Sequence, residues 1–137
     1  MKTFFDSSAL AKRYIAEPGS QSVDDICQKT DQLAICIICV PEIISALNRR
    51  VREKTISKPD YEKAKIQLLN DVRDMDVIYL TEDVIPYAVM LMESNTLRAM
   101  DALHIAAAKT WGCDLFVTAD KEQAAAARRA GLKQSIV

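Results

Sequence analysis

Short apolar runs alternate along this chain with longer segments in which apolar residues recur every three or four positions. The first pattern is typical of β-strands and the second of amphipathic helices, and their alternation favours parallel strands joined by crossover helices. We therefore expect an α/β fold of three layers, with a central, mainly parallel sheet flanked by helices. At 137 residues, the chain fits one domain spanning residues 1–137, because domains most often hold about 100–150 residues.

The boundaries of these elements follow from apolar periodicity and from helix start and stop signals. The expected strands cover residues 2–5, 33–39, 77–80, 115–117 and 134–137. The expected helices cover residues 7–17, 20–29, 57–73, 84–92, 98–111 and 120–130, and a further helix begins at residue 41.

Composition limits the classes of protein that this chain can belong to. Half of the residues are apolar, 27% are charged, and the net charge is −1, which is typical of a soluble globular domain. The balanced charge argues against a broad cationic surface for nucleic acid, although a local basic patch remains open. No apolar stretch is long enough to span a bilayer, and the acid at position 6 comes too early for a signal peptide. We expect a cytoplasmic protein without membrane contact.

Four cysteines raise the question of a redox or metal site. Cys36 and Cys39 form a C-x-x-C, but they lie in an apolar run expected to be a strand, where this spacing sends the side chains to opposite faces. Cys27 and Cys113 supply no second pair, and the chain has one histidine, His104. The favoured interpretation is buried, reduced cysteines that behave as small hydrophobic residues.

Four acidic residues stand at positions where the predicted fold would bring them together. Asp6, Glu42 and Asp120 each follow an expected strand closely, and Asp101 lies early in the helix before the strand at 115–117. Parallel strands end at the same edge of a sheet, and ligands of open α/β sheets bind along that edge. Four carboxylates in one pocket repel one another and need a cation, and oxygen ligands favour Mg²⁺ or Mn²⁺. The chemistry that follows is metal-assisted hydrolysis of a phosphodiester.

A purely structural interpretation remains open for each acid taken singly. Asp6 and Asp120 precede helices, where Asp is a favoured N-cap. Asp101 can pair with Arg98 one turn earlier, and Glu42 can stabilise the first turn of its helix. Capping is the simpler explanation for any one acid alone, whereas a shared edge for all four favours a metal site.

The residues around these acids resemble the motifs of a known family. FFDSSALAKRY at 4–14, PEI at 41–43, LRAMDALHIAAA at 97–108 and LFVTAD at 115–120 are similar to the four motifs of the PIN domain. The motifs stand in the family's order, span nearly the whole chain, and have the spacing of VapC-type toxins of type II toxin–antitoxin systems. Each motif is short, but the combination is specific.

This resemblance implies an endoribonuclease that uses Mg²⁺ or Mn²⁺, is inhibited by a small antitoxin inserting a peptide near the site, and forms a homodimer. By the same resemblance, Ser7 or Thr118 would support the site. After the last acid, Lys121 and Glu122 bring a further cation and a further acid, which leaves the local charge open. The family's catalytic and metal-binding roles carry over to Asp6, Glu42, Asp101 and Asp120.

Basic side chains near the acids are candidates for contacts with RNA phosphates. Arg49 follows Glu42 by seven residues and shares its helix face, so it can bind a phosphate or an acid of an antitoxin. Arg98, Lys12 and Arg13 are further candidates. The alternative for each is an ordinary solvated helix surface.

Three functional alternatives stay open. His104, one turn after Asp101, is either a general base or, more simply, a packed histidine with a local hydrogen bond. The chain could also be a catalytically idle PIN-fold binding or assembly module. An aspartate-nucleophile phosphatase is disfavoured, since such enzymes carry a second acid two residues after the nucleophile and Ser8 stands there after Asp6.

Overall fold

The computed structural model describes residues 1–137 and shows five strands in one sheet, in the order β3-β2-β1-β4-β5. Every neighbouring pair is parallel, so the sheet is wholly parallel. The strands are β1 (Lys2–Phe5), β2 (Gln32–Cys36), β3 (Asp76–Ile78), β4 (Leu115–Thr118) and β5 (Gln134–Ile136). The expected parallel α/β architecture is confirmed.

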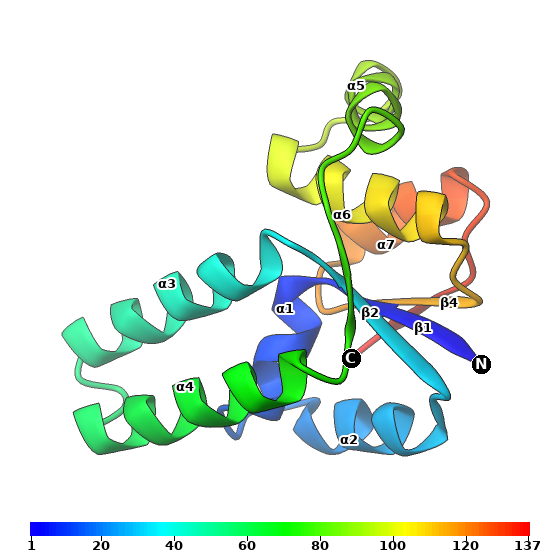
Figure 1. Ribbon diagram of the computed structural model, residues 1–137. Coiled ribbons are helices and arrows are strands. Elements are labelled where there is room, and N and C mark those ends of the chain that lie inside the picture. The colour runs from blue at the N-terminus through cyan, green and yellow to red at the C-terminus, as the bar shows by residue number, and fades with distance from the viewer.

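Helices cover both faces of this sheet and complete the three expected layers (Figure 1). The helices α1 to α4, with the short 3-10 helix η1, lie on one face, and α5 to α7 lie on the other. None of the helices is long and apolar enough to cross a membrane. Their bounds are α1 (Ser7–Leu10), η1 (Ala11–Arg13), α2 (Ser20–Lys29), α3 (Cys39–Arg52), α4 (Lys58–Val72), α5 (Val84–Ser94), α6 (Ala99–Trp111) and α7 (Lys121–Arg129).

The sheet is buried on both faces because successive residues of its central strands enter different cores. Phe4 packs in the core under α5 to α7, and its neighbour Phe5 packs in the core under α1 to α4. This follows from the alternation of side chains along a strand. The rings of Phe4 and Phe116 stack across β1 and β4 with centroids 5.9 Å apart. Two cores therefore hold the central strands rigidly in register.

The strand order reverses between β1 and β4, and this reversal determines where a ligand site can form. From β1 the chain adds β2 and β3 on one side and later β4 and β5 on the other. Crevices in open α/β sheets occur outside the carboxyl ends of the strands at such a switch point. Asp6 follows β1 directly, and its N–H continues the ladder to the carbonyl of Val117 in β4 at 3.0 Å. Two expected site acids, Asp6 and Asp120, therefore stand on the two sides of the switch point.

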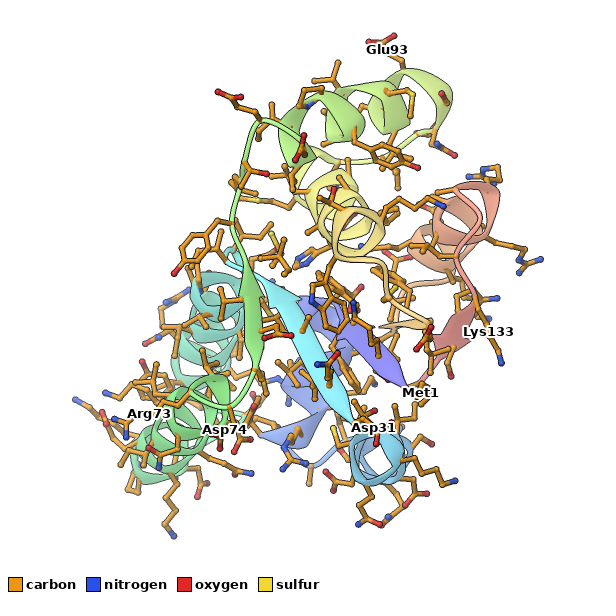
Figure 2. The ribbon with its side chains drawn as sticks, turned by 45° about the vertical axis from the view of Figure 1, so that its right-hand side comes forward. Met1, Asp31, Arg73, Asp74, Glu93 and Lys133 are labelled. Atoms are coloured by element: carbon orange, nitrogen blue, oxygen red, sulfur yellow. The ribbon has the colours of Figure 1, made fainter.

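The amino-terminal edge of the sheet is closed by contacts of a different kind. The terminal ammonium of Met1 pairs with Asp31, and the N–H of Asp31 donates to the carbonyl of Met1 at 3.0 Å. The two residues lie side by side in Figure 2, at the start of β1 and β2. These contacts fix the register of β1 against β2 at the edge opposite the acids.

The expected helix at 7–17 is wrong in its second half. The α-helix ends at Leu10, and the chain continues as η1 to Arg13 before leaving helical structure. Arg13 and Tyr14 both bond to Asp71 of α4, at 2.9 and 3.1 Å, and Arg13 also pairs with Asp24 at 2.9 Å. These contacts with α4 and α2 draw the segment out of the helical path that its apolar periodicity indicates.

The expected strand at 33–39 is also too long, because β2 ends at Cys36 and α3 begins at Cys39. The apolar run continues through the turn because Ile37 and Ile38 pack against the core under α5 to α7. Cys36 and Cys39 enter different cores, as expected, but the turn between them separates the two side chains rather than strand alternation.

All four cysteines are free thiols, and two of them differ from the expected burial. Cys36 and Cys39 are buried, whereas Cys27 and Cys113 are half-buried. Burial raises the pKa of the Cys39 thiol to about 12, which disfavours its reactive thiolate. These thiols therefore contribute packing rather than a reactive pair.

Helix α4 offers a local test of how the sequence starts a helix. Ser57 is its N-cap and accepts a hydrogen bond from the N–H of Asp60 at 3.1 Å. We expect Ser57→Ala to lower the free energy of unfolding by about 1 kcal/mol, measured by urea titration. Ser45→Ala, at an exposed position within α3, is the matched control and should change stability little. Equal effects of the two variants would contradict the assigned cap.

Candidate active site

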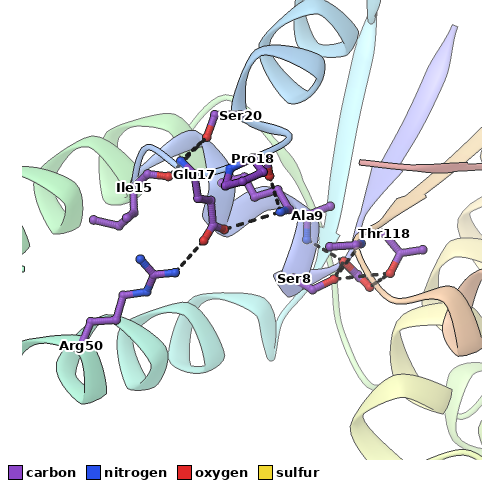
Figure 3. Close-up of polar contacts among 11 residues, drawn as sticks. Ser8, Ala9, Ile15, Glu17, Pro18, Ser20, Arg50 and Thr118 are labelled. Atoms are coloured by element: carbon purple, nitrogen blue, oxygen red, sulfur yellow. Dashed lines mark hydrogen bonds and ion pairs between the residues drawn. The ribbon is translucent and has the colours of Figure 1, made fainter. Parts of the chain in front are cut away.

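Asp6 lies at the junction of β1 and α1 with only 1% of its surface exposed. Its Oδ1 accepts hydrogen bonds from the N–H of Ala9 at 2.9 Å and from Ser8 Oγ at 2.7 Å. Its Oδ2 accepts from Thr118 Oγ1, across the switch point on β4. Figure 3 shows Ser8, Ala9 and Thr118 close together, and each of these residues donates one of the hydrogen bonds to Asp6. The expected capping role of Asp6 is present, and the side chain is at the same time held at the carboxyl edge of the sheet.

The burial of Asp6 has an electrostatic cost. Removal from water raises the pKa of this carboxyl group, and the charge interaction with His104 and the surrounding hydrogen bonds offset only part of the increase. A carboxylate kept there in its charged form is stabilised by any nearby cation. Asp6 is therefore better suited to a cation site than to a simple N-cap, which would be more exposed to water.

Thr118 joins Asp6 to Asp120. Its hydroxyl donates to Asp6 and accepts a hydrogen bond from the N–H of Asp120 at 3.0 Å. Asp120 is the N-cap of α7, where its Oδ1 accepts from the N–H of Glu122 at 2.8 Å and of Gln123 at 3.3 Å. The expected supporting position of Thr118 is thus a direct hydrogen-bond link between two of the acids.

Asp101 is placed in the first turn of α6 without any hydrogen bond or ion pair from its side chain. The alternative pairing with Arg98 does not form, since no contact joins the two side chains. Burial raises the pKa of Asp101, and the neighbouring Asp120 carboxylate raises it further, with smaller contributions from Asp6 and Glu42. The negative charges of the other three acids therefore all act on Asp101.

Glu42 lies in the first turn of α3, and all hydrogen bonds of its side chain are made through one oxygen, Oε1. Its Oε1 accepts a hydrogen bond from Ser7 Oγ at 2.7 Å and lies 2.6 Å from Nε2 of His104 on α6. Partial burial is the largest single influence on the pKa of Glu42 and acts to raise it, but the hydrogen bonds from His104 and Ser7 and the charge interaction with His104 together lower the pKa. Ser7, like Thr118, holds one of the acids.

A hollow of about 680 Å³ opens between α6, α7 and the start of α3. Asp6 is not part of its lining, in keeping with its burial. The structure thus gathers three of the four acids around one hollow and places the fourth beneath its surface. The residues that line it are Glu42, Thr96, Leu97, Arg98, Ala99, Met100, Asp101, Asp120 and Glu122.

A second hollow of about 450 Å³ runs along α3 and adjoins the first. The two share Glu42 and Met100 in their linings, and the second also contains Arg49 and Arg52. Neither arginine forms an ion pair within the chain, unlike Arg50, which pairs with Glu17 (Figure 3). The hollow lined by the acids therefore continues directly into a groove lined by Arg49 and Arg52.

The donors at this site fit a hard divalent cation, with one restriction. No three side chains of the His, Cys, Asp and Glu type are grouped closely enough to hold a metal ion together. Mg²⁺ keeps several waters and usually takes one or two protein carboxylates, with substrate phosphate oxygens completing its shell. The mutual repulsion felt by Asp101 is what such an ion would relieve. The residues present fit an ion bound by few direct ligands rather than a closed protein cage.

Sequence reasoning missed two side chains that hold the acids. Ser8 donates to Asp6 and accepts from the N–H of Ala119 at 3.0 Å. Gln123 is buried and donates from Nε2 to the carbonyl of Asp101 at 3.2 Å, which joins α7 to α6. Ser8 could have been found from its place two residues after a capping Asp. The box-like spacing of Gln123 after Asp120 indicates a helix cap, and it does not reveal a bond to a carbonyl 22 residues earlier.

Several solved structures with the same fold are described as toxins or as toxin–antitoxin complexes. VapBC from Salmonella typhimurium bound to DNA matches with a TM-score of 0.73 at 13% identity, covering 99% of this chain and 98% of that chain. VapBC2 from Rickettsia felis, bound to a promoter DNA fragment, matches with a TM-score of 0.72 at 15% identity, covering 100% and 99%. VapC20 from Mycobacterium tuberculosis, a toxin that cleaves the sarcin–ricin loop, matches with a TM-score of 0.69 at 17% identity, covering 90% and 94%. At such low sequence identity, the similarity to these structures shows a shared fold.

The sequence itself identifies the family. No curated protein matches the chain significantly. The sequence model of the PIN domain, however, matches residues 3–129, which is nearly the whole chain and includes all four acids. This chain is a member of the PIN-domain family.

Proposed function

We propose that this protein is a metal-dependent endoribonuclease that acts as the toxin of a toxin–antitoxin pair. The observation that carries the proposal is the gathering of Glu42, Asp101 and Asp120 around one hollow, with the buried Asp6 linked to Asp120 through Thr118. Membership of the PIN-domain family and a fold shared with VapC-type toxins support it. The whole chain, residues 1–137, would act as one ribonuclease domain.

The four carboxylates Asp6, Glu42, Asp101 and Asp120 would form the acidic site for Mg²⁺ or Mn²⁺, with one or two of them as direct ligands and the others acting through waters of the ion. The bound ion would supply an acidified water and would stabilise the charge that develops on the phosphate and the leaving oxygen. Ser7 and Thr118 keep two of these carboxylates in place through the hydrogen bonds described above. These hydrogen bonds reduce the reorganisation that metal and substrate binding require.

Two arginines are placed to bind the phosphates of the RNA. Arg98 lines the acidic hollow, and Arg49 lines the adjoining groove. Neither is neutralised by an acid of the chain. Seven residues of α-helix separate Glu42 from Arg49, a rise of about 10 Å, which suits a phosphate beyond the one being cleaved. The proposed strand of RNA would cross the acids and continue along α3.

The proposed partners are a cognate antitoxin and a second copy of the chain. Several proteins of the same fold were solved as toxin–antitoxin complexes, which supports an antitoxin here. Helix α5 exposes apolar side chains at Ile85, Val89, Met90 and Met92, a surface suited to a homodimer. We propose that the pair acts in the cytoplasm, where RNA and antitoxin are both present.

A circular single-stranded RNA tests the proposed reaction, because only an endonuclease can open it. With Mn²⁺ or Mg²⁺ we expect linear RNA and then fragments, and EDTA should stop the reaction until metal is restored. A DNA circle of the same sequence should remain intact. Cleavage that persists in EDTA would contradict the metal role, and no cleavage with any divalent ion would favour an idle binding module.

A growth assay tests the proposed toxin role separately. Expression of the chain should arrest growth of a host cell. Co-expression of a short gene adjacent to the natural gene should relieve the arrest if it encodes the antitoxin. Growth arrest that no neighbouring gene relieves would contradict the pairing but leave the nuclease proposal standing.

A further inference from the structure

His104 is buried in an arrangement that packing alone does not explain. Its side chain is 2% exposed, and its Nε2 lies 2.6 Å from Glu42 Oε1 and 3.1 Å from Ser7 Oγ. Its other ring nitrogen, Nδ1, has no hydrogen-bond partner, and it is the only buried side-chain nitrogen or oxygen in the chain without one. The imidazole ring thus makes hydrogen bonds only through Nε2, on the side that faces Glu42 and Ser7.

An unpartnered polar atom in a protein interior has a cost. Nearly all such atoms are paired, because leaving one without a partner forfeits the hydrogen bond that it makes with water in the unfolded chain. A carboxylate only accepts hydrogen bonds, so Nε2 of His104 carries the proton that Glu42 receives. Whichever hydrogen-bonding group Nδ1 presents, an N–H or a lone pair, no atom of the chain meets it. The ring is therefore placed for its contact with Glu42 and not for the best accommodation of both nitrogens.

The contact with His104 restricts Glu42 in a way that is useful for ligation. A glutamate side chain has several rotatable bonds and loses rotamer freedom when a ligand fixes it, and a side chain that is already fixed has less to lose on binding. Both Ser7 and His104 bind the same oxygen, Oε1, and no group of the chain binds Oε2. The carboxylate of Glu42 is therefore oriented while one of its oxygens stays free for a ligand.

The two helices that carry the acids are joined by this contact. His104 stands three residues after Asp101, so the two side chains lie on neighbouring turns of α6. Glu42 comes from α3, 62 residues earlier. The hydrogen bond from His104 therefore sets the position of the carboxylate of α3 relative to that of α6.

From these contacts we infer that His104 is a positioning residue for the metal site. Together with Ser7 it fixes Oε1 of Glu42, so that Oε2 is available as a preoriented ligand of the divalent ion. This role rests on the proposed metal-dependent function. Hydrogen bonds of this kind to ligating side chains typically account for about 10–100-fold in metal affinity.

Calorimetric titration of the purified full chain with Mn²⁺, without RNA, tests this role. We expect His104→Leu, which fills space but donates no hydrogen bond, to weaken Mn²⁺ binding by about 10–100-fold. His104→Gln can present an amide N–H near the position of Nε2 and should keep affinity within a few-fold of the wild type. Equal Mn²⁺ affinity of the wild type and His104→Leu would overturn the inference while the proposed function stands.

A double-mutant cycle separates positioning from general damage to α6. In a Glu42→Gln background, His104→Leu should cause no further loss of Mn²⁺ affinity, because the carboxylate that it orients is gone. A similar loss in both backgrounds would mean that His104 acts through the fold and would overturn the inference. Ile105→Val removes a buried methylene from the same helix and should lower thermal stability without changing Mn²⁺ affinity.

The titrations distinguish failure of the proposed function from failure of the role of His104 alone. If the wild-type chain binds no Mn²⁺, the metal-dependent function and the role of His104 fall together. If the wild type binds Mn²⁺ and the His104 variants match it, only the role of His104 falls. Thermal unfolding in EDTA confirms that each variant is folded before the titrations are compared.

Discussion

Asp6→Asn is expected to lower the rate of RNA cleavage by about 10³-fold or more while leaving the fold intact. The change keeps the volume of the side chain but removes a charge that would bind the catalytic ion, whose contribution amounts to several kcal/mol. The amide oxygen can still accept from Ser8 and from the N–H of Ala9. Cleavage is measured on labelled RNA with Mn²⁺, and folding is measured by thermal unfolding.

Asp6→Asn should gain stability relative to the wild type while it loses cleavage activity. Burial raises the pKa of Asp6 above its ordinary value of 3.8. A carboxyl group with a raised folded-state pKa contributes stability that is fully present below the unfolded-state pKa and is lost as pH rises through the folded-state value. Asn does not titrate, so the stability of Asp6→Asn relative to the wild type should increase as pH rises above about 4.

Two further variants serve as controls for Asp6→Asn. Asp6→Ala removes the cap of α1 and the acceptor of Thr118, and should be less stable than Asp6→Asn by about 1 kcal/mol or more. Asp83→Asn removes an exposed acid at the start of α5 and should leave both cleavage and stability unchanged. Undiminished cleavage by Asp6→Asn would remove Asp6 from the proposed site.

Mn²⁺ is expected to raise the melting temperature of the wild-type chain by several degrees. An ion that binds only the folded state at 100 times its dissociation constant adds about 2.7 kcal/mol of stability, a shift on the order of 10 °C for a domain of this size. The physical source is relief of the repulsion that Asp120, Asp6 and Glu42 exert on Asp101. The melting temperature is measured with and without Mn²⁺, and EDTA should reverse the shift.

Asp101→Asn is the matched variant for this measurement. The Asp101 side chain makes no hydrogen bond, so the substitution removes charge and little else. Without metal we expect Asp101→Asn to be at least as stable as the wild type, because one of the mutually repelling charges is gone. With Mn²⁺ the stabilisation should shrink or vanish in Asp101→Asn and persist in Asp83→Asn. An equal shift in all three proteins would show that Mn²⁺ binds elsewhere.

Much of the fold followed from local sequence signals. The segment at 20–29 is helical as expected, and Gly112 ends α6 in the left-handed conformation at φ 76°, as its position after a helical stripe predicts. Both Asp6 and Asp120 cap helices as expected. Such signals depend on a few neighbouring residues, and therefore a single sequence reveals them.

The expected bounds of two elements were wrong, the helix at 7–17 and the strand at 33–39, because contacts between distant residues outweighed the local pattern of apolar residues. Apolar periodicity indicated a helix through residue 17, but bonds from Arg13 and Tyr14 to Asp71 ended it early. The run at 33–39 is apolar throughout because the residues of the strand, of the turn and of the helix start all pack in or against the two cores. Hydrophobicity alone reports burial and cannot separate these elements.

The sequence by itself determined which acids follow the strands and that those strands are parallel, because periodicity and capping are local. Only the tertiary structure decided that the strand order reverses between Asp6 and Asp120, that Asp6 lies beneath the hollow, and that His104 binds Glu42. Strand order and the pairing of side chains 62 residues apart result from packing of the whole chain. No short stretch of sequence encodes them, which is why His104 could not be distinguished from an ordinary packed histidine.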